Sequence, residues 1–423
     1  MGGLSKMKSI CKLLSLSLII ACLGGCSTAN TETASSSPAV SSAADSTINN
    51  TFTSAGDGLY VTTDSGIYEI QTVFPDSASI FYTDVNTKER VFLCANPNCT
   101  HADESCSSYI ATPSAMFPPM ILRVGNQLLI VFTETTDSSN PHGMLMNMDG
   151  SNRRTVFELA SNQYIQGGFC SSGNDLYFDL YEIDDNTNIT YQLWHTNFQN
   201  ETFEKVMDLG SDDSHYSLCD GVGNELCFNH ISSNGISYCM YDPQSQKMLD
   251  PFYIDNSASG NSMIQDGYLF VLNEQDNSVQ RIRLSDKTQT SATYTVKDGF
   301  GAPSMRYLFD GNLLITEAQT TEIDVPTNDS YDICSYILDF DTGNCTEFTL
   351  QTPYNNRPVY VLTTIGNFCY VATDYKTYTP TSVSKDGTVS DFDYVANIYA
   401  FITKQDYVNS NRNGYLMIND AFK

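Results

Sequence analysis

One short pattern recurs along most of the chain, a Gly, Asn or Asp turn followed directly by a run of apolar and aromatic residues. It is clearest in the segment Gly-Asn-Asp-Leu-Tyr-Phe at 173–178. Seven copies occur, and the apolar residues that open their runs are Leu59, Leu128, Leu176, Leu226, Leu269, Leu313 and Phe368. Successive copies are roughly 43 to 69 residues apart. A turn-into-strand signal at this interval leaves room for about four strands per unit, which is typical of a β-propeller.

The sequence therefore predicts an all-β fold, a β-propeller of seven four-stranded blades over residues 51–423, with six or eight blades as alternatives. In one blade we expect strands at 164–170, 175–184, 191–197 and 202–209. Third strands of other blades are expected at 278–284, 334–340 and 397–403. Many Tyr and Phe residues, with no amphipathic run as long as a helix, agree with this class. A late strand at 415–418 is expected to pair into the first or the last blade and seal the ring.

The N-terminal segment has the layout of an export signal. Lys6, Lys8 and Lys12 precede the apolar run 13–23, which is short for a membrane span. The run ends in Leu-Gly-Gly-Cys, which resembles a bacterial lipobox and implies diacylglycerol on Cys26. The alternative is an ordinary cleaved signal. We therefore expect a lipoprotein signal peptide at 1–25 and a flexible Ser/Thr/Ala-rich tether at 26–50. The expected location is the extracytoplasmic face of the cell membrane.

The charge of the chain is strongly acidic. It carries 49 Asp and Glu against 21 Lys and Arg, a formal net charge of −28. Nucleic acid is excluded as a partner, because binding its phosphates requires a cationic surface. The acidic surface favours solubility and repulsion from a negative cell wall, or alternatively the capture of cations or basic ligands. The expected partners are the membrane, through the lipid anchor, and a glycan, peptide or protein ligand.

A Cys/His loop at 94–108 carries the most chemistry. It contains Cys94, Cys99, His101 and Cys106, and between 95 and 108 no apolar residue is larger than Ala. Because such a loop cannot hold itself by burial, it requires a cross-link. Three thiols and one imidazole suit a structural Zn²⁺, and four protein ligands leave no open position for catalysis. The spacing is not that of a standard zinc finger. A disulfide from Cys94 to Cys99 or Cys106 is the main alternative, and another metal or haem is a third. The remaining cysteines in the strand patterns are predicted to be buried free thiols.

These motifs resemble those of lipid-anchored, propeller-like surface proteins of Gram-positive anaerobes. The resemblance rests on the lipobox, on Phe-Leu-Cys at 92–94 with the other three Cys/His positions, and on the late segments 402–407 and 414–415. The hairpin turns are similar to those of TolB-like and quinoprotein-like blades. The resemblance implies the fold and the location, and it carries no activity.

No catalytic residue is predicted. The chain contains no Gly-x-Ser-x-Gly elbow, zinc-protease motif, phosphate loop or dinucleotide fingerprint. The first hypothesis is therefore a non-enzymatic binding or scaffold module at the cell surface. The second is a polysaccharide hydrolase or lyase whose acids converge on the propeller funnel. A sensor or transporter-associated module is a weaker third.

Overall fold

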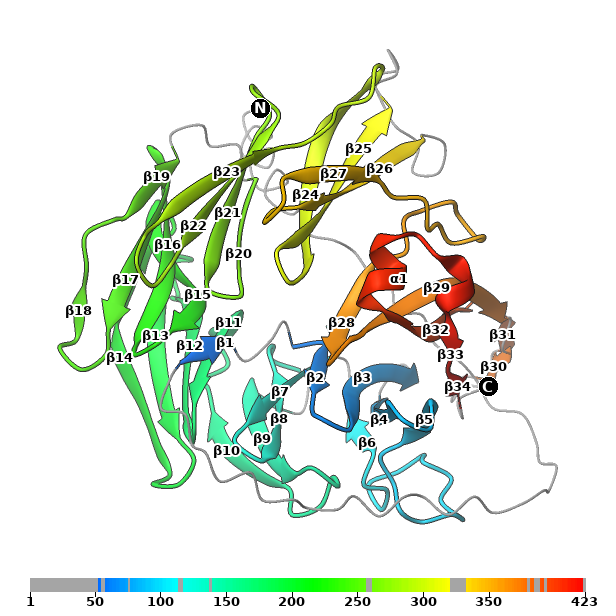
Figure 1. Ribbon diagram of the computed structural model, residues 1–423. Coiled ribbons are helices and arrows are strands. Elements are labelled where there is room, and N and C mark those ends of the chain that lie inside the picture. Colours follow the sequence, from blue (N-terminus) through cyan, green and yellow to red (C-terminus); the bar gives the residue numbers. More distant parts are fainter. Residues whose placement is uncertain are drawn as a thin grey trace, which may run out of the picture.

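The protein is built almost entirely from antiparallel β-sheets that follow one another around a ring, as a computed structural model shows (Figure 1). The structure describes residues 52–54, 58–74, 77–112, 117–136, 139–255, 261–319, 332–378, 381–383, 389–391 and 394–420. The predicted signal peptide, Cys26 and the tether at 26–50 lie outside these ranges, so they stay predictions. Over the same ranges, no helix is long and apolar enough to cross a membrane.

The first two sheets come from the N-terminal third of the chain. The first contains β2 (Tyr60–Thr62), β3 (Gly66–Phe74), β4 (Ser77–Asp84), β5 (Glu89–Phe92), β6 (Tyr109–Ala111) and β34 (Asn419–Asp420). The second contains β7 (Met120–Val124), β8 (Gln127–Phe132), β9 (His142–Asn147) and β10 (Arg154–Glu158).

Two further four-stranded meanders share one ten-stranded sheet. The first comprises β11 (Gln163–Ser172), β12 (Asp175–Ile183), β13 (Ile189–Asn197) and β14 (Thr202–Ser211). The second comprises β15 (Ser214–Val222), β16 (Glu225–Ser232), β17 (Gly235–Asp242) and β18 (Lys247–Met248), with β19 (Tyr253–Asp255) also paired to β17. A two-residue ladder between β14 and β15 makes the two meanders continuous. The number of seven blades stays a prediction, because strand pairing does not separate these two units.

The C-terminal half forms three more sheets. They contain β20 (Ser262–Gln265), β21 (Tyr268–Asn273), β22 (Ser278–Arg283) and β23 (Gln289–Thr293); β24 (Phe300–Phe309), β25 (Asn312–Gln319), β26 (Ile333–Asp339) and β27 (Asn344–Glu347); and β28 (Val361–Ile365), β29 (Phe368–Tyr378), β32 (Tyr394–Thr403) and β33 (Leu416–Met417). A small hairpin, β30 (Thr381–Val383) with β31 (Val389–Asp391), extends from the last sheet between β29 and β32. The helix α1 (Lys404–Val408) and the 3₁₀ turn η1 (Arg412–Gly414) follow β32.

These bounds confirm the four strands predicted at 164–209 and the third strands predicted near 278, 334 and 397. Six of the seven repeated turns also lie at one equivalent position, immediately before the second strand of a four-stranded unit. At Asp266 and Gly267 the φ angles are 51° and 74°, the left-handed pair that a tight hairpin turn requires. The leucines that follow five of these turns, at 128, 176, 226, 269 and 313, are fully buried.

The predicted first copy, at 56–61, is wrong. Leu59 is 45% exposed, and the strand after it, β2, is the innermost strand of its sheet rather than the second. The equivalent turn lies at 63–66 and delivers Ile67, which is fully buried, into β3. This turn reads Thr-Asp-Ser-Gly, without the Gly-Asn or Asp-Gly pair of the others.

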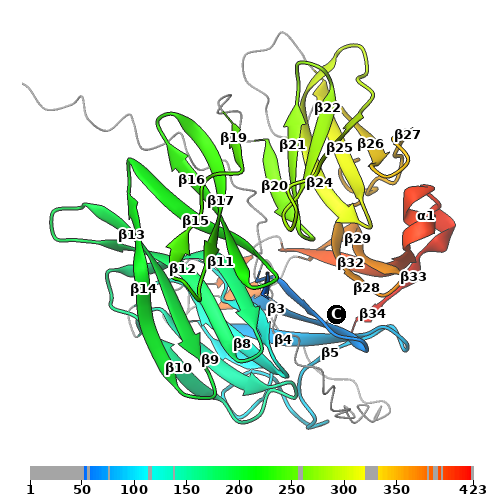
Figure 2. The same ribbon diagram turned by 60° about the vertical axis from the view of Figure 1, so that its left-hand side comes forward.

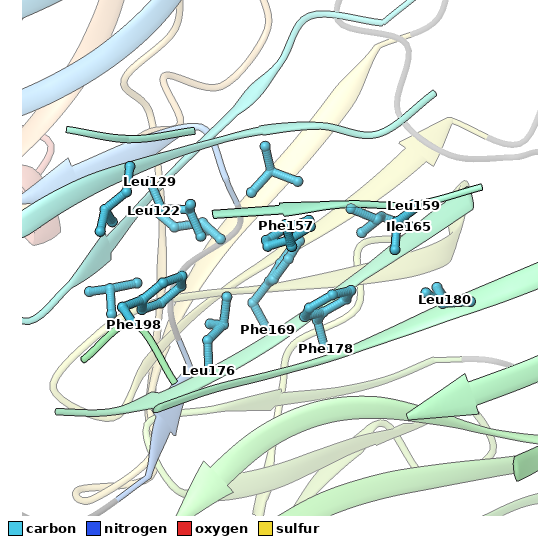
Figure 3. Packing of buried hydrophobic residues seen from close by; sticks show 13 residues of the cluster. Leu122, Leu129, Phe157, Leu159, Ile165, Phe169, Leu176, Phe178, Leu180 and Phe198 are labelled. Atoms are coloured by element: carbon cyan, nitrogen blue, oxygen red, sulfur yellow. The ribbon is translucent and has the colours of Figure 1, made fainter. Parts of the chain in front are cut away.

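Hydrophobic cores lie between neighbouring sheets, since each sheet buries one face against the sheet before it and the other against the sheet after it. Figure 3 shows one such core, where Leu122 and Leu129 of the second sheet, with Phe157, pack toward Phe169 and Phe178 of the next. Each fully buried side chain of this size contributes about 1.5–3 kcal/mol. The stability of the ring is therefore spread over its inter-sheet contacts.

The C-terminal residues join the last sheet to the first. Leu416–Met417 (β33) pairs with β32, and Asn419–Asp420 (β34) then pairs in parallel with β5. Thus the late strand predicted at 415–418 contacts the last sheet, and the residues just after it contact the first. Figures 1 and 2 show the two sheets adjacent, with β34 close to β5.

A buried arginine lies at this closure. Arg90, on β5, has no exposed side-chain surface and forms an ion pair with Glu69 of β3. Its other nitrogens bind Asp420 of β34 at 2.9 Å and Gln71 at 2.8 Å. The guanidinium also lies 3.8 Å from the ring centroid of Phe81. One side chain therefore connects three strands of the first sheet, including the C-terminal one.

The N-terminal strand β1 (Thr53–Ser54) lies between two other units. It pairs with β11, while the preceding Phe52 bridges to Gly223 at the turn after β15. The Ser54 amide donates to the carboxylate of Asp220 at 3.0 Å. This segment thus links the third and fourth units, remote from the first sheet that follows it in sequence.

Candidate metal centre

The Cys/His loop interrupts the outer strand of the first sheet. Both β5 and β6 pair with the same edge of β4, where β5 lies opposite residues 81–83 and β6 lies opposite residues 77–79. Between them Ile80 donates its amide to the Ser108 carbonyl, and its carbonyl accepts the Leu93 amide. Residues 93 and 108 are therefore held at one point of β4, and everything between them is an excursion from that edge. The predicted insertion at 94–108 in the first blade has this position.

The excursion brings the four predicted ligands together. The sulfur atoms of Cys94, Cys99 and Cys106 and a ring nitrogen of His101 all lie within 4.8 Å of one another. His101 Nδ1 and Cys106 Sγ are 3.2 Å apart. Cys106 is buried, whereas the other three residues are partly exposed. Residue types and short spacings thus predicted a real spatial cluster.

Short-range turns fold the loop onto itself. The amide of Cys99 donates to the Asn96 carbonyl, and the amide of Cys106 donates to the Asp103 carbonyl. The Asp103 side chain also accepts from the Ser105 amide at 2.9 Å. Each cysteine that follows such a turn is directed back toward the strand ends, which brings the thiols into one volume.

His101 is fixed by its backbone and its ring. Its φ angle is 56°, in the left-handed region that is uncommon for residues other than glycine. Its imidazole stacks on Phe92, with ring centroids 4.1 Å apart and planes 10° apart. The strained backbone and the stacked ring together aim Nδ1 at the thiols.

Arg153, from the turn between β9 and β10, supports the loop from outside. It donates to the carbonyls of Tyr109 and Ser107. Ser107 in turn donates to the Leu93 carbonyl at 2.7 Å, which ties the two ends of the loop together. Arg153 lies some 50 residues downstream in sequence, and nothing in the motif itself indicated its role.

The thiols have unlike acidities. Burial acts to raise the pKa of Cys106, but hydrogen bonds from Ser108 and His101 outweigh it and lower this pKa to about 6. At Cys99, the His101 amide lowers the pKa, but burial and the adjacent thiols raise it to about 11. The thiolate form is therefore favoured more strongly at Cys106 than at Cys99.

The donor set fits a soft tetrahedral metal ion. Zn–S bonds of about 2.3 Å and Zn–N bonds of about 2.0–2.1 Å place the ligand atoms of such a site roughly 3.5–3.8 Å apart, a separation that the 4.8 Å limit accommodates. Deprotonated thiols are the form that binds a metal. Asp103 and Glu104 are both exposed, as expected of acids outside a closed site.

All ten cysteines in the described ranges are free thiols. Outside the cluster, five are buried as predicted, at 170, 227, 239, 334 and 369. Cys219 and Cys345 are only partly buried, so the prediction of buried thiols is wrong for these two.

The deeply buried carboxyl groups near the ring interior serve structural hydrogen bonds. Asp179 accepts the amides of Gly168 and Leu218, each at 3.0 Å. Burial raises the pKa of Asp179 to about 7 even though both amides act to lower it. Asp220 accepts from the Ser54 amide, and the carboxylate of Glu69 pairs with Arg90. These contacts explain why the acids are there without assigning them a catalytic task.

The fold and the cluster define a class: an all-β, propeller-type protein with a potential metal-binding Cys₃His loop in its first sheet. No protein-family model matches the sequence, and no curated protein matches it.

Several solved structures are similar in shape. For a prolyl endopeptidase the identity is 11% and the TM-score 0.42, and the match covers 84% of this chain but 55% of the enzyme, so this chain spans about half the length of that protein. For oligogalacturonate lyase from Vibrio parahaemolyticus the identity is 9%, the match covers 83% of this chain and 92% of the lyase, and the TM-score is 0.38. For TolB from Acinetobacter baumannii the identity is 9%, the match covers 85% of this chain and 77% of TolB, and the TM-score is 0.34. Likeness at this level concerns architecture and carries no activity to this chain.

Proposed function

We propose that this protein is a lipid-anchored propeller on the extracytoplasmic face of a cell membrane, where it acts as a non-enzymatic binding or scaffold module for a glycan, peptide or partner protein. In this proposal Cys94, Cys99, His101 and Cys106 hold a structural Zn²⁺, and Cys26 carries diacylglycerol. The observation that carries the proposal is the convergence of four soft ligands at the split outer strand of the first sheet.

The position of the cluster supports a structural role for the metal. Its four protein ligands fill a tetrahedral coordination sphere, so a substrate or an activated water has no place on the ion. The loop also lies at the outer edge of its sheet, where it joins β5 to β6 across Ile80. Bound metal would stabilise this edge, because the loop itself buries few apolar side chains.

The metal is tested by elemental analysis of the purified full-length protein. We expect one equivalent of zinc, lost in His101→Ala and in Cys99→Ser. Cys345→Ser is the matched control, since Cys345 is a partly exposed thiol outside the cluster, and it should keep the zinc. Absence of metal, together with a mass deficit of two hydrogens that a reductant reverses, would establish the disulfide alternative instead.

A second measurement separates a local role of the metal from a global one. Hydrogen exchange with and without a chelator should show faster exchange at 94–108 and unchanged protection in the other sheets. General loss of protection would mean that the metal holds the whole ring, and unchanged exchange in the loop would contradict a structural metal.

The anchor is tested in cells that process lipoproteins. Cys26→Ala should release the protein from membranes or leave an uncleaved precursor. The segment Ile-Ile-Ala-Cys at 19–22 also matches a lipobox loosely, but cleavage there would shorten the apolar run, so Cys22→Ala should stay anchored. If Cys26→Ala still partitions into the detergent phase with the mass of the mature protein, the lipid anchor is not on this residue.

A further inference from the structure

A cavity of about 500 Å³ lies outside the metal centre, at one end of the sheet β24–β27. One wall is formed by the start of β26, by Lys297 in the segment before β24 and by Phe300, the first residue of β24. The other is formed by Glu347, the last residue of β27, and by the segment that leaves this strand, including Asn355 and Arg357. Figure 1 shows this second segment passing from β27 toward β28. The volume is in the range of small-molecule sites and suits a ligand the size of a short peptide.

The charges that line this cavity are balanced. Two cations, Lys297 and Arg357, and two acids, Asp332 and Glu347, line it, although acids outnumber bases more than twofold in the chain as a whole. Lys297, Asp332 and Glu347 form no ion pair with any residue that the structure describes. The Lys297 ammonium instead lies 4.9 Å from the ring centroid of Phe300, another lining residue. Groups of both signs are thus available to a ligand.

The wall at 349–357 is held in place by its own hydrogen bonds. The Thr352 amide donates to the Arg357 carbonyl, and the Asn356 amide donates back to the Thr352 carbonyl, both at 2.9 Å. The C-terminal elements brace it, because Arg412 donates to the Gln351 carbonyl at 2.7 Å. A wall fixed in this way loses little conformational freedom when a ligand binds.

A buried carboxyl group lies directly behind the lining. Glu317, on β25, is 1% exposed and stands opposite the lining residue Cys334 in the strand ladder. One of its oxygens accepts the Lys297 amide at 3.2 Å, and the other is buried without a partner among the described residues. An unpaired buried acceptor is costly, and burial raises the pKa of this carboxyl. Glu317 therefore provides a hydrogen-bond acceptor behind the side of the cavity that contains Cys334.

We propose that this cavity binds a zwitterionic ligand, a free amino acid or a short peptide with both termini unblocked. The ammonium group is received by Glu347 and Asp332, and the carboxylate by Lys297 and Arg357. The aromatic ring of Phe300 and the amide of Asn355 contact the part of the ligand between its charged ends. This inference rests on the proposed binding function and names the ligand class for it.

The test is calorimetric titration of the full-length protein in detergent with trialanine, N-acetyl-trialanine and trialanine amide. We expect trialanine to bind. Each blocked peptide should bind at least about tenfold more weakly than trialanine, because each has lost one charge-assisted contact. Lys297→Met should weaken trialanine and N-acetyl-trialanine but leave trialanine amide nearly unchanged. Glu347→Gln should show the opposite selectivity.

Two controls keep the result specific to the cavity. Lys247→Met and Glu274→Gln remove exposed charges on other sheets and should change nothing. Equal binding of all three peptides, no peptide binding, or binding of a neutral oligosaccharide such as chitotriose in their place would overturn the proposal. Oligosaccharide binding would still leave the binding function standing, and the zinc and anchor measurements are independent of every peptide result.

Discussion

Arg90 should be the most sensitive single residue at the closure of the ring. Arg90→Met keeps much of the volume but removes a buried cation that binds Glu69, Gln71 and Asp420. Loss of one partner from a buried ion pair typically costs about 3–5 kcal/mol, because the other charge stays buried without compensation. We expect the free energy of unfolding to fall by this amount, a large part of the total for a protein of ordinary stability.

The double variant separates the ion pair from the packing. In Arg90→Met with Glu69→Leu, no charge of this pair is left buried, so much of the lost stability should return. A simple packing defect would instead grow when a second side chain is changed. The difference between single and double variants measures the coupling of the two residues directly.

The pH dependence provides a second check. Burial raises the pKa of Glu69, while Arg90 opposes this rise. In Arg90→Met the folded-state pKa must rise further, whereas the unfolded value stays at about 4.3. An acid whose folded pKa is raised costs stability as pH increases from the unfolded value to the folded one. The loss in Arg90→Met should therefore be smaller at pH 5 than at pH 8.

Urea unfolding followed by circular dichroism measures these differences. Lys404→Met is a suitable control, because Asp310, the partner of Lys404, has a largely exposed side chain. This ion pair should therefore contribute less than about 1 kcal/mol to stability. A loss below about 1 kcal/mol in Arg90→Met, or a double variant no more stable than the single one, would refute the argument.

Three further outcomes are expected. The pKa of Asp179 is raised to about 7, so ionisation of this buried carboxyl should lower the free energy of unfolding by a few kcal/mol as pH rises from about 4 to 7. In Asp179→Asn the free energy of unfolding should therefore change less between pH 5 and 8 than in the wild type. The same pH dependence in both proteins would contradict this. Gly168→Ala would place a methyl group against the Leu218 carbonyl and should lower the unfolding free energy by about 1–3 kcal/mol, whereas a neutral result would show that the strands can separate. Tyr407→Phe removes a buried 2.6 Å hydrogen bond to the Val359 carbonyl and should cost about 1–2 kcal/mol by urea titration; a stability equal to wild type would mean that the carbonyl finds another donor.

The strand meanders were predictable because each is local. A turn such as Asp266–Gly267 and the buried Leu269 after it are determined within a few residues. The interval between copies of this pattern then predicts the length of one four-stranded unit. The first unit was misplaced because the segment at 56–61 matches the pattern better than the true turn at 63–66. A glycine-rich approach to an innermost strand and a hairpin turn look alike in sequence.

The contacts that join distant parts were not predictable in the same way. Phe52 and Thr53 pair with residues more than 100 positions further along the chain. A segment this short shows no alternation of polar and apolar residues from which a strand could be predicted. Arg90 occupies a four-residue strand, Glu-Arg-Val-Phe, in which polar and apolar residues do not alternate. Sequence alone therefore places this arginine in water rather than against Phe81. The Cys/His cluster was the exception, because its ligands lie within thirteen residues and chemistry rather than periodicity identifies them.

The pairing of β34 with β5 also sets an order of events during folding. Asn419 pairs with Glu89, and Asp420 with Arg90, so this contact must bridge about 330 residues of chain. Contacts of such separation form late, because the loop they close is entropically costly until the intervening sheets have condensed. Until then the edge of β5 has no strand beside it and is open to pairing with another chain. The time between synthesis of Arg90 and arrival of Asp420 is therefore the interval in which this protein most depends on protection from aggregation.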